Sequence, residues 1–246
     1  MPTAVALDFD GLLVDGLNEC VLVSWNGFHQ KDLDAFGPEG LDAVPAPFID
    51  RFTNHRNFAR HLGHFAAPFY LPRHFSSQAE FDAAFATLDP VAVEDFVTRA
   101  SAYRDSVRRK HYQRWLQYHA YYPGVERLLK HLDCSIYIVT GKDAASVDEL
   151  LRRAGIRVSA ARIFGECRNK IPVLKQIADI EGAETIDVSF FDDNVMNACS
   201  AHKSGFTSYW ATWGYHAPDH AALARAAGVP ELSLDAFAAM DFGAAS

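Results

Sequence analysis

Apolar residues at the start of the chain predict a buried strand that ends in carboxylates. Residues 4–9 are apolar except for Asp8, and Asp10 and Gly11 follow directly. A short apolar run closed by a turn signal is typical of a buried strand. Side chains two apart on a strand point to the same side. We therefore expect Asp8 and Asp10 to leave the carboxyl end of this strand together, where open α/β sheets bind their ligands.

The second half of the chain alternates short apolar runs with amphipathic segments. Strands that alternate with helices of about ten residues indicate βαβ units and a parallel sheet. Glycines at 155, 205 and 228 follow three of the amphipathic segments and predict their ends. The predicted strands are residues 134–139, 162–164, 186–191 and 207–211, and the predicted helices are residues 125–132, 143–154, 171–180, 198–203 and 218–227.

Between these regions the pattern is helical. Residues 94–117 carry apolar side chains at close to a 3.6-residue period, and Asp89 with Pro90 predicts the start of that helix. Ser77 and Glu80 have the spacing of a capping box. The predicted fold is α/β, with a Rossmann-like parallel-sheet core formed by residues 1–15 and 122–246. Residues 16–121 are predicted to form an inserted α-helical domain.

Composition and net charge argue against several classes of binding partner. The 246 residues carry a net charge of −8, which argues against a nucleic-acid surface and against binding to an anionic membrane. No apolar run approaches the roughly 20 residues of a membrane span, and the N-terminus lacks the pattern of a signal peptide. Four widely separated cysteines predict reduced thiols and a cytoplasmic protein. The oligomeric state is left open.

Further polar residues follow the predicted strands. Thr140 and Gly141 end one strand, where a hydroxyl could bind a phosphate oxygen and glycine would let the backbone come close. Lys170 starts a helix, where a cation opposes the helix dipole. Asp192 and Asp193 end another strand. Four carboxylates meeting in one crevice would require a divalent cation.

Each of these signals also has a plain structural interpretation. Asp8 and Asp10 could form a Mg²⁺ site, an acid/base pair or both, or a solvated acidic turn. Thr140 could be an ordinary strand end, and Lys170 a surface lysine. Histidines at 55, 61 and 64 lie near one another, but we expect them to pack or to face solvent rather than to bind metal.

Together these motifs resemble the haloacid dehalogenase superfamily, in its phosphatase-like branch. The Asp-x-Asp-Gly motif after a strand is met by residues 8–11. The strand-end Thr or Ser is met by Thr140, and the later lysine by Lys170. The acidic pair after another strand is met by Asp192 and Asp193. The resemblance covers residues 1 to about 15 and about 122 to 240, and four motifs in the family's order are a specific signal.

The resemblance implies a phosphoryl-transfer mechanism on a small phosphorylated metabolite. Asp8 is implied as the nucleophile that forms an aspartyl-phosphate, and Asp10 as the acid and base. Thr140 is implied to bind the phosphoryl group, with Gly141 beside it, and Lys170 to neutralise charge. The implied ligands of Mg²⁺ are Asp8, the Asp10 carbonyl and Asp193, with Asp192 holding a metal-bound water.

The resemblance also implies a role for the helical insertion and leaves rival functions. The insertion stands where the family has a cap that covers the site. Arg56 and Arg60 are four apart, so we expect them to share a helix face and to grip an anionic substrate or simply to be solvated. Arg104 is expected to be solvated. A phosphomutase, a metal-independent dehalogenase and a non-catalytic binding protein on the same scaffold are the alternatives.

The chain departs from the family pattern at three positions. Leu12 stands where Thr or Val is usual, Asn197 where another Asp is usual, and Gly16 where Ser or Thr is common. We expect a changed loop contact at Leu12. The missing charge at Asn197 is expected to weaken the binding of Mg²⁺.

Overall fold

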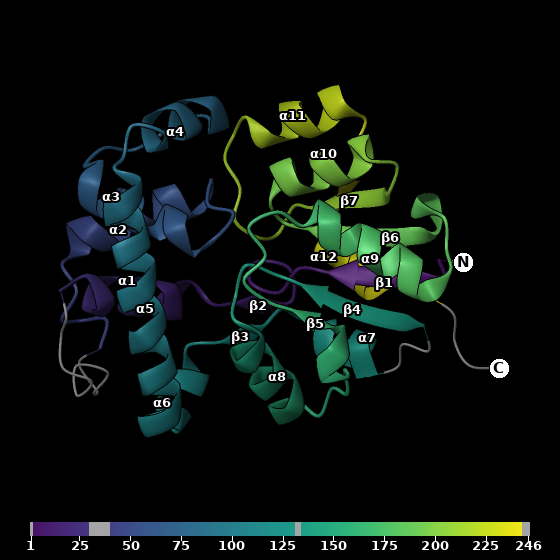
Figure 1. Cartoon of the computed structure of the whole chain (residues 1–246), viewed down its shortest axis with the longest axis horizontal. Coiled ribbons are helices and arrows are strands. Elements are labelled where there is room, and N and C mark those ends of the chain that lie inside the picture. The colour runs from purple at the N-terminus through teal and green to yellow at the C-terminus, as the bar shows by residue number, and fades with distance from the viewer. Residues whose placement is uncertain (1, 30–39, 131–133, 243–246) are drawn as a thin grey trace. The chain divides into compact units, whose positions relative to one another are not determined.

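The computed structural model describes residues 2–29, 40–130 and 134–242. The chain divides into two compact units (Figure 1). The first, Met1–Asp15 with Tyr121–Ser246, is called the core unit below, and the second, Gly16–Ala120, the helical unit. No helix of the described residues is both long and apolar enough to cross a membrane.

The core unit is built on a parallel sheet of six strands in the order β5-β4-β1-β6-β7-β8. Every neighbouring pair runs parallel. The strands are β1 (Ala4–Leu7), β4 (Ser135–Val139), β5 (Ile163–Phe164), β6 (Val188–Asp192), β7 (Thr207–Ala211) and β8 (Glu231–Leu232). The predicted α/β fold with a parallel sheet is confirmed.

The order of the strands reverses at β1. From β1 the chain adds β4 and β5 on one side, and then returns to add β6, β7 and β8 on the other. Leu7 at the end of β1 is in register with Ile138 of β4 and with Phe191 of β6. The residues that follow these positions therefore leave the sheet side by side, at the topological switch point where open α/β sheets bind ligands.

Helices cover the sheet because strand side chains alternate between its faces. Ala6, Val139 and Phe190 pack with Leu174 and Ile177 of a helix on one face. Phe191 points the other way, and its ring stacks 4.8 Å from that of Tyr209. The helices of the core unit are α7 (Val125–Lys130), α8 (Ala144–Arg153), α9 (Ile171–Glu181), α10 (Val195–Lys203), α11 (His220–Ala227) and α12 (Leu234–Ala238).

The boundaries of these elements differ slightly from the prediction. β6 begins at Val188 because a 3₁₀ turn, Thr185–Asp187, occupies the residues before it. α10 begins at Val195 rather than 198 because the Asn194 side chain accepts the backbone N–H groups of Met196 and Asn197. The end of the helix predicted at 125–132 falls partly outside the described residues.

The helical unit is held together by packed aromatic rings. Those of Phe28 and Phe69 stack 3.9 Å apart, and Phe48 and Trp25 pack against Phe69. The helices are α1 (Leu17–His29), α2 (Ala46–Arg56), α3 (Ala67–Tyr70), α4 (Gln78–Phe85), α5 (Pro90–Lys110) and α6 (Tyr112–Gln117), with a 3₁₀ helix at Leu62–Ala66. Two-residue strands, β2 (Val14–Asp15) and β3 (Ala120–Tyr121), flank this region in the sequence.

Two predictions for the helical unit need correction. The pattern at 94–117 predicts one helix, but α5 ends at Lys110 and α6 starts at Tyr112, because His111 has φ −126° and ψ 40°. Arg104 is buried rather than solvated, with its Nε 2.7 Å from Oε1 of the fully buried Glu19. The Asp89 cap of α5 is confirmed.

Candidate functional site

Asp8 leaves β1 at the carboxyl edge of the sheet, and its backbone and side chain are both held. Its N–H donates to the Phe191 carbonyl at 3.0 Å, which extends the pairing with β6 by one residue. Its Oδ1 accepts the Phe9 N–H at 2.7 Å, and its Oδ2 lies 2.9 Å from the Lys170 ammonium. One carboxylate oxygen is therefore fixed by the backbone and the other by a buried cation.

Lys170 joins two strand ends. It is the residue before α9, and its ammonium lies 2.7 Å from Oδ2 of Asp192 as well as 2.9 Å from Asp8. Burial alone would lower the pKa of Lys170, but Asp192 and Asp8 raise it above its ordinary value, so the lysine is charged. Lys170 therefore does not stabilise α9 through the helix dipole. Its charge instead pairs with the carboxylates of Asp8 and Asp192.

Asp192 ends β6 and is fully buried. Its Oδ1 accepts the Asn194 N–H at 2.8 Å, and its Oδ2 accepts the Asn197 side-chain amide at 3.1 Å in addition to Lys170. Asn197, a departure from the family pattern, is thus a hydrogen-bond donor to the acidic pair. A carboxylate at this position would repel Asp192 where the amide binds it.

Asp193 is enclosed by backbone from two loops. Its Oδ2 accepts the Tyr215 N–H at 2.9 Å, and its carbonyl accepts the Trp210 indole N–H at 2.8 Å. Gly11 and Gly214 press against its side chain so closely that a Cβ on either would overlap it. Gly11 also has φ +94°, which an L side chain rarely adopts. Both glycines are therefore needed to seat this carboxylate.

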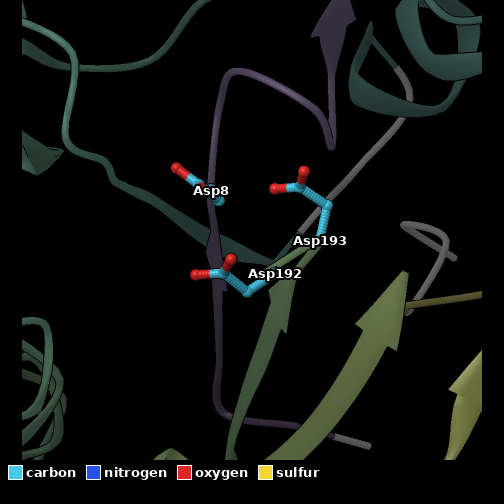
Figure 2. A group of neighbouring side chains, drawn as sticks. All are labelled: Asp8, Asp192 and Asp193. Carbon is cyan, nitrogen blue, oxygen red and sulfur yellow. The ribbon is translucent and has the colours of Figure 1, made fainter. Parts of the chain in front are cut away.

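Asp8, Asp192 and Asp193 form one group of carboxylates (Figure 2). One oxygen of each lies within 4.8 Å of those of the other two. The side chains come from the ends of β1 and β6, as Figure 2 shows. Oxygen donors at this spacing suit a hard divalent cation. Among the described residues, the histidines at 55, 61 and 64 form no such group.

Thr140 follows β4 and is buried on the other side of β1. Its N–H donates to the Phe164 carbonyl at 2.9 Å, and its hydroxyl accepts the Lys142 N–H at 3.2 Å. Gly141 lies between them and is half-buried. The loop after β4 is therefore folded tightly around the Thr140 hydroxyl.

Lys142 is the residue that sequence reasoning missed. Its side chain is 0% exposed, and its ammonium lies 3.2 Å from Oδ2 of Asp10. Its position in the sequence could have indicated this contact, because Lys142 lies only two residues after Thr140 at the end of a strand. A lysine at such a position must either reach solvent or pair with an acidic side chain. Each carboxylate of the first motif thus has its own buried lysine.

The fold of the chain is similar to that of known structures over nearly their whole length. A predicted phosphatase from Clostridium acetobutylicum is 18% identical, with a TM-score of 0.61, and the match covers 97% of each chain. A haloacid dehalogenase-like hydrolase from Streptococcus pneumoniae is 16% identical, with a TM-score of 0.57 over 95% of this chain and 94% of that one. The chain has the fold of the haloacid dehalogenase-like hydrolases.

A further match is a predicted phosphoglycolate phosphatase from Haemophilus somnus, 18% identical over 88% of each chain, with a TM-score of 0.55. The resemblance inferred from the four motifs is confirmed at the level of this fold. No family model and no curated protein matches the sequence.

Leu12 shows how this chain fills one position that departs from the haloacid dehalogenase pattern. The residue is fully buried, and its carbonyl accepts the Trp213 indole N–H at 3.0 Å. Trp213 precedes Gly214, where an added Cβ would lie 2.3 Å from the Gly11 carbonyl oxygen and 2.5 Å from the Asp193 Cβ. Leu12 therefore joins the loop after β1 to the loop after β7, which encloses Asp193.

The expectation that Arg56 and Arg60 share a helix face is wrong. α2 ends at Arg56, because the chain turns at Asn57, so Arg60 lies beyond the helix. Arg60 forms two hydrogen bonds with Asp82, at 2.9 and 3.1 Å. Arg56 is buried, with its guanidinium 5.6 Å from the centre of the Phe65 ring. Both side chains hold the helical unit together.

His61 and His64 pack against each other, one of the two outcomes expected for these histidines. The rings of His61 and His64 lie 4.1 Å apart, and Nδ1 of His64 accepts the Arg60 N–H at 3.1 Å. His61 is the residue before the 3₁₀ helix Leu62–Ala66. Burial, with added repulsion from His61 and Arg60, lowers the pKa of His64 well below its ordinary value, so the ring is neutral.

Proposed function

We propose that this chain is a Mg²⁺-dependent phosphatase that removes phosphate from a small phosphorylated metabolite through an aspartyl-phosphate. The observation that carries the proposal is the pairing of Asp8 with the buried Lys170 ammonium at the carboxyl end of β1. A carboxylate held in this way has a fixed direction and a cation beside it, as a nucleophile toward an anionic phosphoryl group requires. The fold of the similar phosphatases supports the same activity.

In the first step, an Asp8 oxygen forms a bond to phosphorus while the bond from phosphorus to the leaving oxygen breaks. The leaving oxygen takes the electron pair of that bond and receives a proton from Asp10. Lys170 offsets the charge on the phosphoryl oxygens, and the Thr140 hydroxyl donates to one of them with Gly141 alongside. These are the roles that the family resemblance implies.

In the second step, water attacks the phosphorus of the aspartyl-phosphate. Asp10 has lost its proton in the first step, so it accepts a proton from this water. The acyl-phosphate bond breaks, Asp8 is regenerated and inorganic phosphate leaves. In the structure the Lys142 ammonium lies 3.2 Å from Oδ2 of Asp10.

The residues of the site fit a divalent cation. The carboxylates of Asp8, Asp192 and Asp193 carry more negative charge than the Lys170 ammonium neutralises. We propose that Asp8, Asp193 and the Asp10 carbonyl hold Mg²⁺, with Asp192 reaching it through water. When bound, the ion would draw charge from the phosphoryl oxygens. Asp192 already accepts three hydrogen bonds, so we assign it a smaller part in binding Mg²⁺ than Asp8 and Asp193.

We further propose that the helical unit is a cap that selects the substrate and excludes water. Its position in the sequence supports this, since the chain leaves the core after Asp15 and returns at Tyr121. We propose Arg56 and Arg60 as candidate contacts to an anionic substrate, although in the structure Arg56 packs on Phe65 and Arg60 pairs with Asp82.

The test is phosphate release from a panel of phosphorylated metabolites, with Mg²⁺ and with a chelator. The panel includes phosphoglycolate, because one similar structure is described as a predicted phosphoglycolate phosphatase. We expect release with Mg²⁺, loss of release with the chelator, and none from the Asp8→Asn variant. Release that persists unchanged in Asp8→Asn would contradict the proposal.

A further inference from the structure

We propose that Lys142 is a positioning residue that holds the Asp10 carboxyl group toward the leaving oxygen of the substrate. This inference rests on the proposed function, in which Asp10 protonates that oxygen. It assigns to the loop after β4 a second task, in addition to the contact of Thr140 with the phosphoryl group.

The first support is the enclosure of Lys142. Its side chain is 0% exposed, whereas a lysine is almost never fully buried without a partner. Its ammonium lies 3.2 Å from Oδ2 of Asp10, a residue 132 positions earlier in the chain. The contact therefore depends on the folded core and fixes one oxygen of Asp10 in a defined direction.

The second support is that the backbone of Lys142 is fixed at both ends. Its N–H donates to the Thr140 hydroxyl at 3.2 Å, and its carbonyl accepts the Glu166 N–H at 2.9 Å. Gly165 lies so close that a Cβ there would be 2.8 Å from the Lys142 carbonyl. A buried side chain on a backbone held in this way keeps a fixed position, whereas a surface counter-ion would be mobile.

The third support is that the two buried lysines contact different carboxylates. Lys170 contacts Asp8 and Asp192, whereas Lys142 contacts Asp10. If Lys142 only neutralised charge, its loss would affect every substrate alike. If it aims Asp10, its loss must affect only those reactions in which the leaving oxygen needs a proton.

That difference can be measured with two esters. In an alkyl phosphate the P–O bond breaks with its electron pair on an alkoxide, which takes the proton of Asp10. In p-nitrophenyl phosphate the electron pair leaves on a stabilised phenolate that needs no proton. General acid catalysis contributes about 100- to 10,000-fold where it is needed. The value of kcat/KM covers only the steps up to loss of the first product, so later hydrolysis of the aspartyl-phosphate does not obscure the comparison.

The experiment measures kcat/KM of the full chain with Mg²⁺ for the preferred alkyl phosphate and for p-nitrophenyl phosphate. The variants are Lys142→Met, Asp10→Asn and the pair combined. Lys175→Met is the matched control, because Lys175 is exposed on α9. Lys142→Leu, which also removes the hydrogen-bond donor, replaces Lys142→Met if thermal melting shows that the latter is unfolded.

We expect Lys142→Met to lower kcat/KM by about 100-fold for the alkyl phosphate and by less than about 3-fold for p-nitrophenyl phosphate. Added to Asp10→Asn, it should cause little further loss on the alkyl ester, because both changes remove the same contribution. Equal losses on the two esters, or full additivity with Asp10→Asn, would overturn the inference. If the wild type shows no metal-dependent turnover on any ester, the proposed function itself fails and this inference with it.

Discussion

Gly11 packs against Asp193 so closely that any side chain at position 11 would overlap the carboxylate. Its φ of +94° adds a second reason for glycine, since an L residue in such a conformation costs about 1–2 kcal/mol. We predict that Gly11→Ala displaces Asp193, lowers the free energy of unfolding by more than this backbone cost, and removes binding of Mg²⁺. Chemical denaturation and calorimetric titration with Mg²⁺ measure the two effects.

Gly182 is the matched control for this change. It has φ +61° at the end of α9, and a Cβ there would have no atom within 4 Å. Gly182→Ala should therefore cost only the backbone strain of about 1 kcal/mol and leave the binding of Mg²⁺ intact. If Gly11→Ala behaves like Gly182→Ala in both measurements, the close packing of Gly11 on Asp193 has no bearing on the site.

Lys170 is predicted to matter for both turnover and stability. Lys170→Met leaves Asp8 and Asp192 close together in a buried place without its ammonium. Breaking a buried ion pair on one side costs about 3–5 kcal/mol, and removing a charge-stabilising donor lowers kcat about 100- to 1000-fold. Urea unfolding without metal and steady-state phosphate release measure these losses. Lys175→Met, at an exposed position on α9, should change neither by a comparable amount.

The pair of Glu19 and Arg104 is predicted to be a main element of the stability of the helical unit. Arg104→Met leaves the Glu19 carboxylate buried with its 2.7 Å partner removed, at a cost of about 3–5 kcal/mol. The double variant Glu19→Leu/Arg104→Met should lose less than the single variant, because it buries no charge. Denaturant unfolding measures both. Arg109→Ala, which breaks an exposed pair with Asp105, should cost less than about 1 kcal/mol.

His220 is predicted to make the core unit less stable in mild acid. Burial of the ring lowers the pKa of His220 to about 4, although Asp219 acts in the opposite direction, and its Nδ1 accepts the Ala217 N–H. Between pH 6.5 and 4 the unfolded chain binds a proton that the folded chain does not. Stability from this residue is therefore present above pH 6.5 and is lost as the pH falls, by about 1–2 kcal/mol from pH 7 to pH 5.

Urea unfolding at the two pH values tests this prediction. His220→Asn keeps an acceptor near Nδ1 but has no titrating group, so it should lose that part of the pH dependence. His202→Asn, which changes an exposed histidine, should keep it. An unchanged pH dependence in His220→Asn would show that other groups cause the acid loss.

Strand ends were the part of the site that the sequence could predict. The runs before Asp8, Thr140 and Asp192 are short, apolar and closed by polar residues, so both the strands and the edge where they end follow from local pattern. Parallel strands then bring these residues together whatever the loops do. The order of the four motifs along the chain then indicated a resemblance to the haloacid dehalogenase superfamily.

Contacts between distant residues were beyond the sequence. Lys142 meets Asp10 across 132 positions, and Arg60 meets Asp82 across 22, through packing that no local period encodes. The break at His111 was missed for the opposite reason, since apolar residues continue at helical spacing on both sides of it. The period of apolar residues predicts which face of a helix is buried, but it cannot predict that a single residue such as His111 interrupts the helix.

Trapping the phosphorylated enzyme tests most directly whether Asp8 becomes phosphorylated during turnover. The enzyme is mixed with its best substrate and Mg²⁺, quenched in acid within one turnover, digested and analysed by mass spectrometry. We predict a phosphoryl group on the peptide that contains Asp8, and its absence in Asp8→Asn. Turnover by the wild type with the Asp8 peptide unmodified at every quench time, while Asp8→Asn remains active, would contradict the account.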